Sequence, residues 1–149
     1  MNVLWQPFVA AAAVFAIAMV LNAPRRSLPF SALMGGTVWL IFLLIKGQGS
    51  VVLATFAAAA VTGLLAQLFA RIFKTPATVF LISTIYLFVP GTSIYRAVFG
   101  LISGNRNQFL FYANETIMIA GAIATAVFMI DSIFLIASRV NARKDVHHD

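Results

Sequence analysis

The residues best suited to binding a small polar molecule lie in one short stretch, Val89-Pro90-Gly91-Thr92-Ser93-Ile94-Tyr95-Arg96. Proline lacks a backbone donor and glycine tolerates irregular dihedral angles, so Pro90-Gly91 predicts a break in a helix. At the start of the next half-helix, free backbone N–H groups and the hydroxyl groups of Thr92 and Ser93, as N-cap residues, would favour a carboxylate. Arg96 follows one turn later and adds a positive charge. The candidate substrate-binding residues are therefore Pro90, Gly91, Thr92, Ser93, Tyr95 and Arg96.

Two acidic residues are candidates for binding and releasing protons within an apolar segment. Asp131 lies within the apolar run 128–134, and a carboxylate inside a membrane is a functional candidate because burying its charge is costly. An acid in such a place can load and release protons, so Asp131 is a candidate proton-coupling residue. The alternative is that Asp131 is hydrated or paired with a basic residue. Glu115, nearer the outer end of the same apolar segment, is the second candidate and is better placed as a gate residue.

The sequence lacks the residues that disulfides, metal sites and the common catalytic motifs require. The sequence has no cysteine, which excludes disulfides and thiolate metal sites. Its two histidines, His147 and His148, lie together in a polar tail without the spacing of a metal site. Neither a Gly-x-Ser-x-Gly elbow nor a phosphate-binding loop is present. We therefore expect no enzymatic activity, no metal and no cofactor.

The composition requires a membrane. Of the 149 residues, 62% are hydrophobic and 9% are charged, whereas soluble domains have about 25% charged residues. The mean hydropathy is +0.98 and the net charge is +6. The basic residues stand in ones and twos at the ends of apolar segments and form no patch, which argues against nucleic-acid binding. We therefore expect contact with membrane lipid and no nucleic acid.

The apolar segments are long and continuous, so they satisfy their backbone groups only as helices. They cover residues 5–21, 30–45, 51–69, 76–89 with 94–103, and 112–137. The predicted fold is an all-α membrane protein with about five transmembrane helices, the fourth discontinuous at Pro90-Gly91. We expect residues 90–93 to be non-helical at membrane depth. The alternative is a simple proline kink, with Arg96 reaching the membrane interface.

The basic residues also predict an orientation. With five spans, seven of them fall on one side of the membrane: Arg25, Arg26, Arg71, Lys74, Arg139, Arg143 and Lys144. Only Lys46 and Arg106 fall on the other side. The positive-inside rule then places the N-terminus outside the cell and the C-terminus in the cytoplasm. Residues 1–138 would form a single transmembrane domain and residues 139–149 a cytoplasmic tail.

Pairs of small residues predict close helix contacts. Ala59 and Gly63 are four residues apart, as are Ala120 and Ala124. Such pairs let helices approach closely in lipid. Among the polar residues in the spans, Gln67 and Asn114 are expected to make hydrogen bonds between helices.

Two stretches carry a resemblance to a known family. The first is residues 15–28, which include Asn22, Pro24 and Arg25, followed by Gly35-Gly36. The second is residues 89–96, where Pro-Gly followed by Tyr-Arg in an apolar context is the more specific pattern. In these stretches the chain resembles the threonine/serine exporter (ThrE) family, and specifically its small YjjB-type component, which matches the C-terminal half of the fused exporters. Length and layout agree over essentially the whole chain.

The resemblance implies export of small hydrophilic metabolites, threonine and serine in the fused type and dicarboxylates such as succinate in the split type. It also implies a larger exporter subunit of the same family as partner. An odd number of spans agrees with this, because fusing two such halves inverts one relative to the other. We therefore predict a subunit of a secondary exporter in the inner cell membrane. The alternative is a non-transporting membrane scaffold or regulatory subunit, and a higher oligomer remains open.

Overall fold

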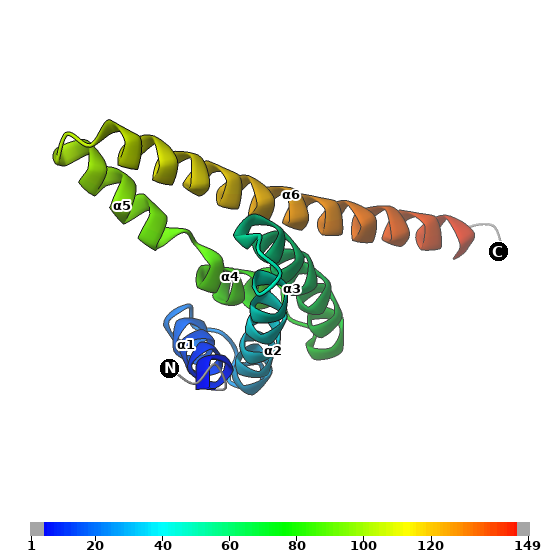
Figure 1. Cartoon of the computed structure of the whole chain (residues 1–149). Helices are drawn as coiled ribbons and strands as arrows, with labels where there is room; N and C mark the ends of the chain where they lie inside the picture. The colour runs from blue at the N-terminus through cyan, green and yellow to red at the C-terminus, as the bar shows by residue number, and fades with distance from the viewer. Residues whose placement is uncertain (1–4, 146–149) are drawn as a thin grey trace.

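The computed structural model describes residues 5–145, with side chains placed over residues 5–138. This part of the chain is helical and contains no strand, which confirms the predicted all-α fold (Figure 1). The helices, in chain order, are α1 (Gln6–Val20), α2 (Leu28–Lys46), α3 (Val51–Phe73), α4 (Ala77–Ile85) followed by the short 3-10 helix η2 (Tyr86–Phe88), α5 (Gly91–Ile102) and α6 (Arg106–Asp145).

The helices correspond to the predicted segments, but they do not all have the length of a span. Within the described residues, α2, α3 and the 106–138 part of α6 are long and apolar enough to cross a membrane. The pair formed by α4–η2 and α5 passes the same test together and is bent by 46° at its break, as predicted for a discontinuous span. Helix α1 has 15 residues, about 22 Å of helix against a hydrocarbon core of ~30 Å. The predicted total of five spans therefore stays a prediction.

Helix α6 is much longer than the segment predicted at 112–137. It has 40 residues, or about 60 Å of helix. It begins after Asn105, whose side-chain Oδ1 accepts the backbone N–H of Gln108 at 3.1 Å, and a side-chain cap of this kind starts a helix. At its other end α6 runs through the first part of the predicted polar tail to Asp145. His147 and His148 lie outside the described residues.

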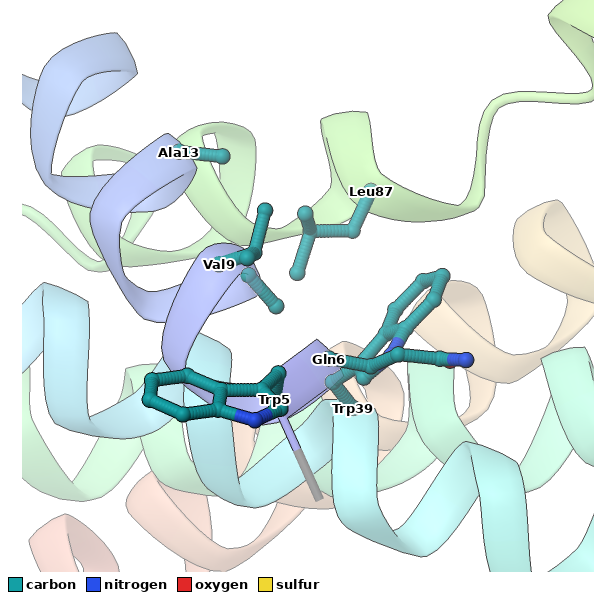
Figure 2. A pocket seen from close by; sticks show the side chains of 7 residues that line it. Trp5, Gln6, Val9, Ala13, Trp39 and Leu87 are labelled. Atoms are coloured by element: carbon teal, nitrogen blue, oxygen red, sulfur yellow. The ribbon is translucent and has the colours of Figure 1, made fainter. Parts of the chain in front are cut away.

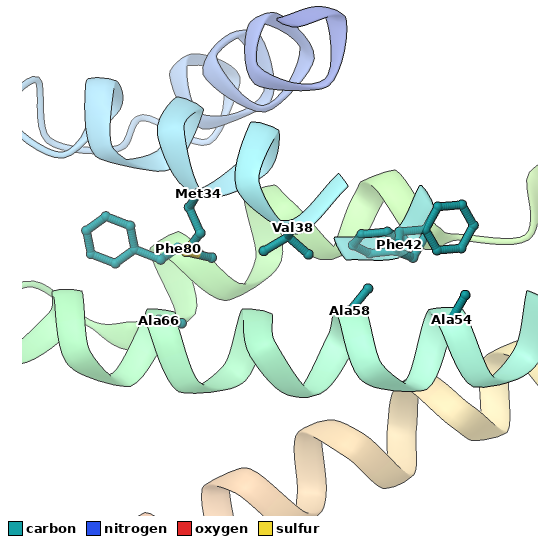
Figure 3. Close-up of a cluster of buried hydrophobic side chains, with 8 residues drawn as sticks. Met34, Val38, Phe42, Ala54, Ala58, Ala66 and Phe80 are labelled. Atoms are coloured by element: carbon teal, nitrogen blue, oxygen red, sulfur yellow. The ribbon is translucent and has the colours of Figure 1, made fainter. Parts of the chain in front are cut away.

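The core lies between α2, α3 and α4. Met34, Val38 and Phe42 of α2 face a row of alanines on α3, and Phe80 of α4 closes the cluster (Figure 3). The alanines present almost no side-chain volume, so the large side chains of α2 and α4 pack directly on the α3 backbone. Three hydroxyl groups buried in this bundle bond a carbonyl of their own helix, namely Thr55, Thr62 and Ser83, so they need no partner from another helix.

Aromatic rings hold α4 at both of its ends. Near its start, the Phe80 ring lies 5.7 Å from the Phe69 ring of α3, measured between centroids. Beyond its end, the Phe88 ring lies 5.5 Å from that of Phe42 and 6.0 Å from that of Trp39, both in α2. Edge-on and tilted aromatic pairs at these separations are favourable beyond the area they bury. The packing of Phe88 therefore fixes the position at which the chain leaves the bundle.

Helices α1 and α2 are joined by the motif predicted at residues 22–36. Asn22 adopts a left-handed conformation after α1 (φ 54°), and the Pro24 carbonyl accepts both the N–H and the hydroxyl of Ser27, at 2.8 and 2.7 Å. Gly35 then packs against α1, where an added Cβ would lie 2.8 Å from Val14 Cβ. A Cβ added at Gly36 would lie 3.1 Å from the carbonyl oxygen of Pro7. Glycine at these two positions lets the helices touch.

Helix α6 lies along α3 and then extends past it. Its tight contact with α3 is at Gly63, where an added Cβ would lie 3.1 Å from Ile130 Cγ2, which confirms the predicted role of the Ala59–Gly63 pair. Ala120 and Ala124 are exposed, so the second predicted pair contacts no helix of the described chain. Beyond the start of α3, residues 106–117 of α6, about 18 Å of helix, pair with α5 alone. We call this hairpin of α5 and residues 106–117 the arm (Figure 1).

The contact at Gly35 gives a direct test of the bundle. Gly35→Ala should lower the free energy of unfolding by about 1–3 kcal/mol, because the new methyl group overlaps Val14 and overpacked interiors shift at that cost. The measurement is thermal unfolding of the purified protein in detergent, followed by circular dichroism. Gly121→Ala is the matched control, since nothing lies within 4 Å of its added Cβ. Equal stability of the two variants would contradict the close α1–α2 contact.

Candidate functional site

The predicted break is present but shorter than expected. Only Val89 and Pro90 are non-helical between η2 and α5, and α5 begins at Gly91. The prediction that residues 90–93 are non-helical was therefore wrong in extent. Pro90 occupies the N-cap position (φ −76°, ψ 51°) and makes no side-chain hydrogen bond there. Its fixed φ suits the entry to a helix. Thr92 and Ser93, expected to cap the helix, lie instead in its first turn.

The first turn of α5 keeps two free backbone donors. The N–H of Gly91 bonds Val89 O at 2.7 Å, and that of Ile94 bonds Pro90 O at 2.9 Å. Among the described residues, the N–H groups of Thr92 and Ser93 have no acceptor. Unpaired N–H groups of this kind carry the positive end of the helix dipole. The turn can therefore accept an anionic group from outside the chain.

Two polar contacts join α5 to α6 one helical turn apart. The Ser93 hydroxyl donates to Glu115 Oε2 at 2.8 Å. Arg96 Nη1 donates to the Tyr112 hydroxyl at 2.9 Å, and the guanidinium lies 5.3 Å from the centre of the Tyr112 ring. Because the two helices are antiparallel, the spacing of three residues on each side brings both pairs into register. These two contacts thus place one acid and one base on facing helices.

The site is open on one side. Thr92 and Arg96 are exposed, whereas Ser93, Tyr112 and Glu115 are half-buried between the helices. Near the tip of the arm the backbones touch, since a Cβ added at Gly100 would lie 2.8 Å from Phe109 N. That contact keeps α5 close enough to α6 for the short side chains of the site to meet.

The site lies at one end of the bundle and not at its middle. Phe88, two residues before Pro90, packs on Phe42, which is four residues from Lys46 at the end of α2. Lys46 Nζ itself lies 5.6 Å from the centre of the Phe42 ring. The break is therefore on the Lys46 side of the bundle, closer to that end than the sequence suggested.

One tyrosine of the sequence prediction is outside this cluster and another, not predicted, belongs to it. Tyr95 is 69% exposed and stacks on Phe99 of its own helix at 6.4 Å between centroids. Tyr112, which was not among the predicted site residues, is the residue that binds Arg96. The sequence did contain a signal for it: Tyr112 and Glu115 are three residues apart, as are Ser93 and Arg96.

Asp131, the other acidic candidate, lies elsewhere. It is exposed, and its Oδ1 accepts a hydrogen bond from Gln67 Nε2 of α3 at 2.9 Å, which confirms the interhelical role expected of Gln67. One turn further along α3, the Arg71 guanidinium lies 5.0 Å from the centre of the Phe134 ring. Sixteen residues of α6 separate Asp131 from Glu115, or about 24 Å. The prediction for Asn114 was wrong, because its Nδ2 donates to Met118 Sδ of its own helix, at 4.0 Å, and not to another helix.

One cavity of the bundle is unsuited to a hydrophilic ligand. A cavity of about 390 Å³ lies between α1, α2 and η2, lined by apolar side chains with Gln6 as the one polar exception (Figure 2). The side-chain oxygen of Gln6 already accepts the indole N–H of Trp39 at 3.3 Å. Apolar walls of this kind suit a hydrocarbon chain. The polar cluster of the arm is thus the better candidate site.

Comparison with known families identifies the family of this chain. Residues 6–133 match the family described as "Threonine/Serine exporter, ThrE". The chain belongs to this family. Comparisons with curated proteins and with solved structures found no match. The matched residues of this ThrE protein run from α1 to Ile133 of α6, so they include the break, both polar contacts of the arm and Asp131. Its membership identifies a membrane transport protein of the exporter type.

Accessibility of the arm can be tested with single cysteines, because the ThrE chain has none of its own. Thr92→Cys should react with a water-soluble maleimide in intact membranes, since Thr92 is exposed beside the charged groups. Ala97→Cys is the control, because Ala97 is 7% exposed and packs against α6. A Thr92→Cys protein that reacts only after denaturation would show a sealed region, as a purely structural break requires.

Proposed function

We propose that this chain is a subunit of a secondary exporter for small amino acids or dicarboxylates, of the threonine/serine or succinate class. Membership of the ThrE family supports export, and the polar cluster on the arm is the observation that supports a substrate site. An apolar helical hairpin has no structural need of an arginine and a glutamate in lipid, where such groups are costly.

In this proposal the arm binds the carboxylate of the substrate. The N–H groups of Thr92 and Ser93 and the guanidinium of Arg96 lie on the same short helix and all favour an anion. Helix N-termini stabilise anions by roughly 0.3–1 kcal/mol at exposed sites and by more when partly buried. Transporters with broken helices hold anionic groups of their substrates in this way. Pro90 and Gly91 set the position of the turn.

The open side of the site favours a partner. Thr92 and Arg96 are exposed, and within the described chain α5 packs mainly on α6. Lipid cannot satisfy these groups, so a protein surface or a water-filled path must face them. A larger exporter subunit of the same family would supply that surface and complete the path. A higher oligomer of the complex is compatible with the same arrangement.

We place the protein in the inner cell membrane. In the proposed orientation the N-terminus lies outside and the C-terminal tail, residues 139–149, lies in the cytoplasm. The positive-inside rule supports it. The contacts support the number of crossings between α3 and α6: residues 63, 67 and 71 of α3 face residues 130, 131 and 134 of α6 in the same order. The two helices therefore run in the same direction, as two spans separated by one returning span must. The Lys46 end, and the arm with it, would then face outward.

A non-transporting scaffold or regulatory subunit is the alternative function. The observation in its favour is that each charged side chain of the arm's polar cluster already has a hydroxyl partner within the chain. In a scaffold these contacts would only hold α5 on α6, and the region around Pro90 would be sealed by the partner.

Replacement of Arg96 tests the proposed function. Cells producing this chain together with the larger component should export serine, threonine or succinate, and cells producing either protein alone should not. Arg96→Gln should weaken substrate affinity by about 10- to 150-fold, since loss of a charged hydrogen-bond partner costs ~1.5–3 kcal/mol. The measurement is the concentration dependence of export, with membrane levels of the protein compared by immunoblot.

Arg106→Gln is the matched control for that variant. It removes the same charge from the same arm, but Arg106 is an exposed residue at the tip, away from the break. Export kinetics that are equal in the two variants would contradict a binding role for Arg96 and leave it as a residue that reaches the membrane interface.

Asp131 is proposed as the proton-coupling residue, with Glu115 acting at the outer gate. Asp131→Asn keeps the shape of the side chain and an acceptor for Gln67 while removing the titratable group. We expect this variant to lose accumulation of substrate outside under an imposed proton gradient and to keep downhill export. Export that keeps both its extent and its pH dependence would place the coupling group in the partner.

A further inference from the structure

Arg96 and Glu115 are opposite charges on facing helices, yet they are not paired with each other. Arg96 uses Nη1 for the Tyr112 hydroxyl, and Glu115 accepts from the Ser93 hydroxyl. The described residues contain no ion pair between them. Neutral hydroxyl partners position the two charged groups, but they do not neutralise either charge.

This arrangement is unusual for a membrane helix pair. Opposite charges one helical turn apart are close enough to attract each other, and the attraction grows as water is excluded. A pair retained only for structure would therefore be expected to close into a salt bridge. Here the two hydroxyl contacts hold the charges apart, one turn from each other along the arm.

We propose that Glu115 is a specificity-determining residue that binds the ammonium group of a substrate whose carboxylate is held by Arg96 and the first turn of α5. The inference rests on the proposed function and adds to it. A molecule carrying an ammonium and a carboxylate group on the same carbon atom would satisfy both charges at once. Tyr112 and Ser93 are positioning residues, which keep the guanidinium and the carboxylate from neutralising each other.

The same geometry disfavours a dicarboxylate. Its first carboxylate would meet Arg96, but its second would approach Glu115, and like charges in a partly desolvated site repel. The charge of Glu115 thus separates the two substrate classes left open above. It would select amino acids such as serine over diacids such as succinate.

Binding to the full-length chain in lipid nanodiscs tests this role. The probes are radiolabelled L-serine and succinate, each measured by equilibrium dialysis. The wild-type chain should bind serine more tightly than succinate. Glu115→Gln should change the ratio of the two affinities by about 10- to 100-fold in favour of succinate. Glutamine still offers an oxygen to Ser93, so the α5–α6 contact is kept.

Two further variants make the result specific. Glu115→Asp keeps the negative charge and should retain the preference for serine. Asn114→Ala removes the neighbouring polar side chain, which is exposed and contacts only Met118, and should leave the ratio unchanged. A ratio that Glu115→Gln does not alter, or a wild-type preference for succinate, would overturn the role of Glu115 alone. A wild-type chain that binds neither probe would instead refute the carboxylate site of the proposed function, and this inference with it.

Discussion

The packing of Phe88 on Phe42 and Trp39 is the contact on which the rest of the structure depends. It sets the point at which the returning helix stops following α3. Pro90 then prevents the helix from continuing unbroken, because it lacks a donor and clashes with the preceding turn. The result is a bend of 46°, after which α5 packs mainly on α6. The arm, and the polar cluster on it, exist because α4 is held at its end by aromatic rings.

A second constraint acts on the arm itself. In lipid every polar group needs a partner, and α5 and α6 provide hydroxyl partners for Arg96 and Glu115 from their own facing surfaces. Gly100 makes this feasible, because the close approach of the two backbones lets a serine reach across to a glutamate. What the arm does not satisfy, the N–H groups of Thr92 and Ser93, is grouped at its base next to the bundle. The side-chain contacts of Arg96 and Glu115 thus stabilise the arm, while the N–H groups of Thr92 and Ser93 stay available to a ligand.

Much of this was visible in the sequence, and the exceptions have physical reasons. Apolar run lengths predicted the helices, and Pro90-Gly91 predicted the break, because both effects are local. The pairing of Arg96 with Tyr112 was not predicted, since it depends on the register of α5 against α6, which the contact at Gly100 sets. Tyr95 was favoured over Tyr112 because it is nearer to the break in sequence, but helical geometry turns it away from α6.

The continuity of α6 links the two ends of the molecule. Glu115 and Asp131 lie on one unbroken helix, and the first contacts the arm while the second contacts α3. A displacement of the arm about Val89-Pro90 must therefore also move α6 against α3, because a helix transmits such a shift along its axis far better than a loop does. The tight contact of Gly63 with Ile130, one residue before Asp131, prevents a closer approach of α6 to α3. A change at the polar cluster that moves α6 would therefore reach the Gln67–Asp131 hydrogen bond, which joins the same two helices beside that contact.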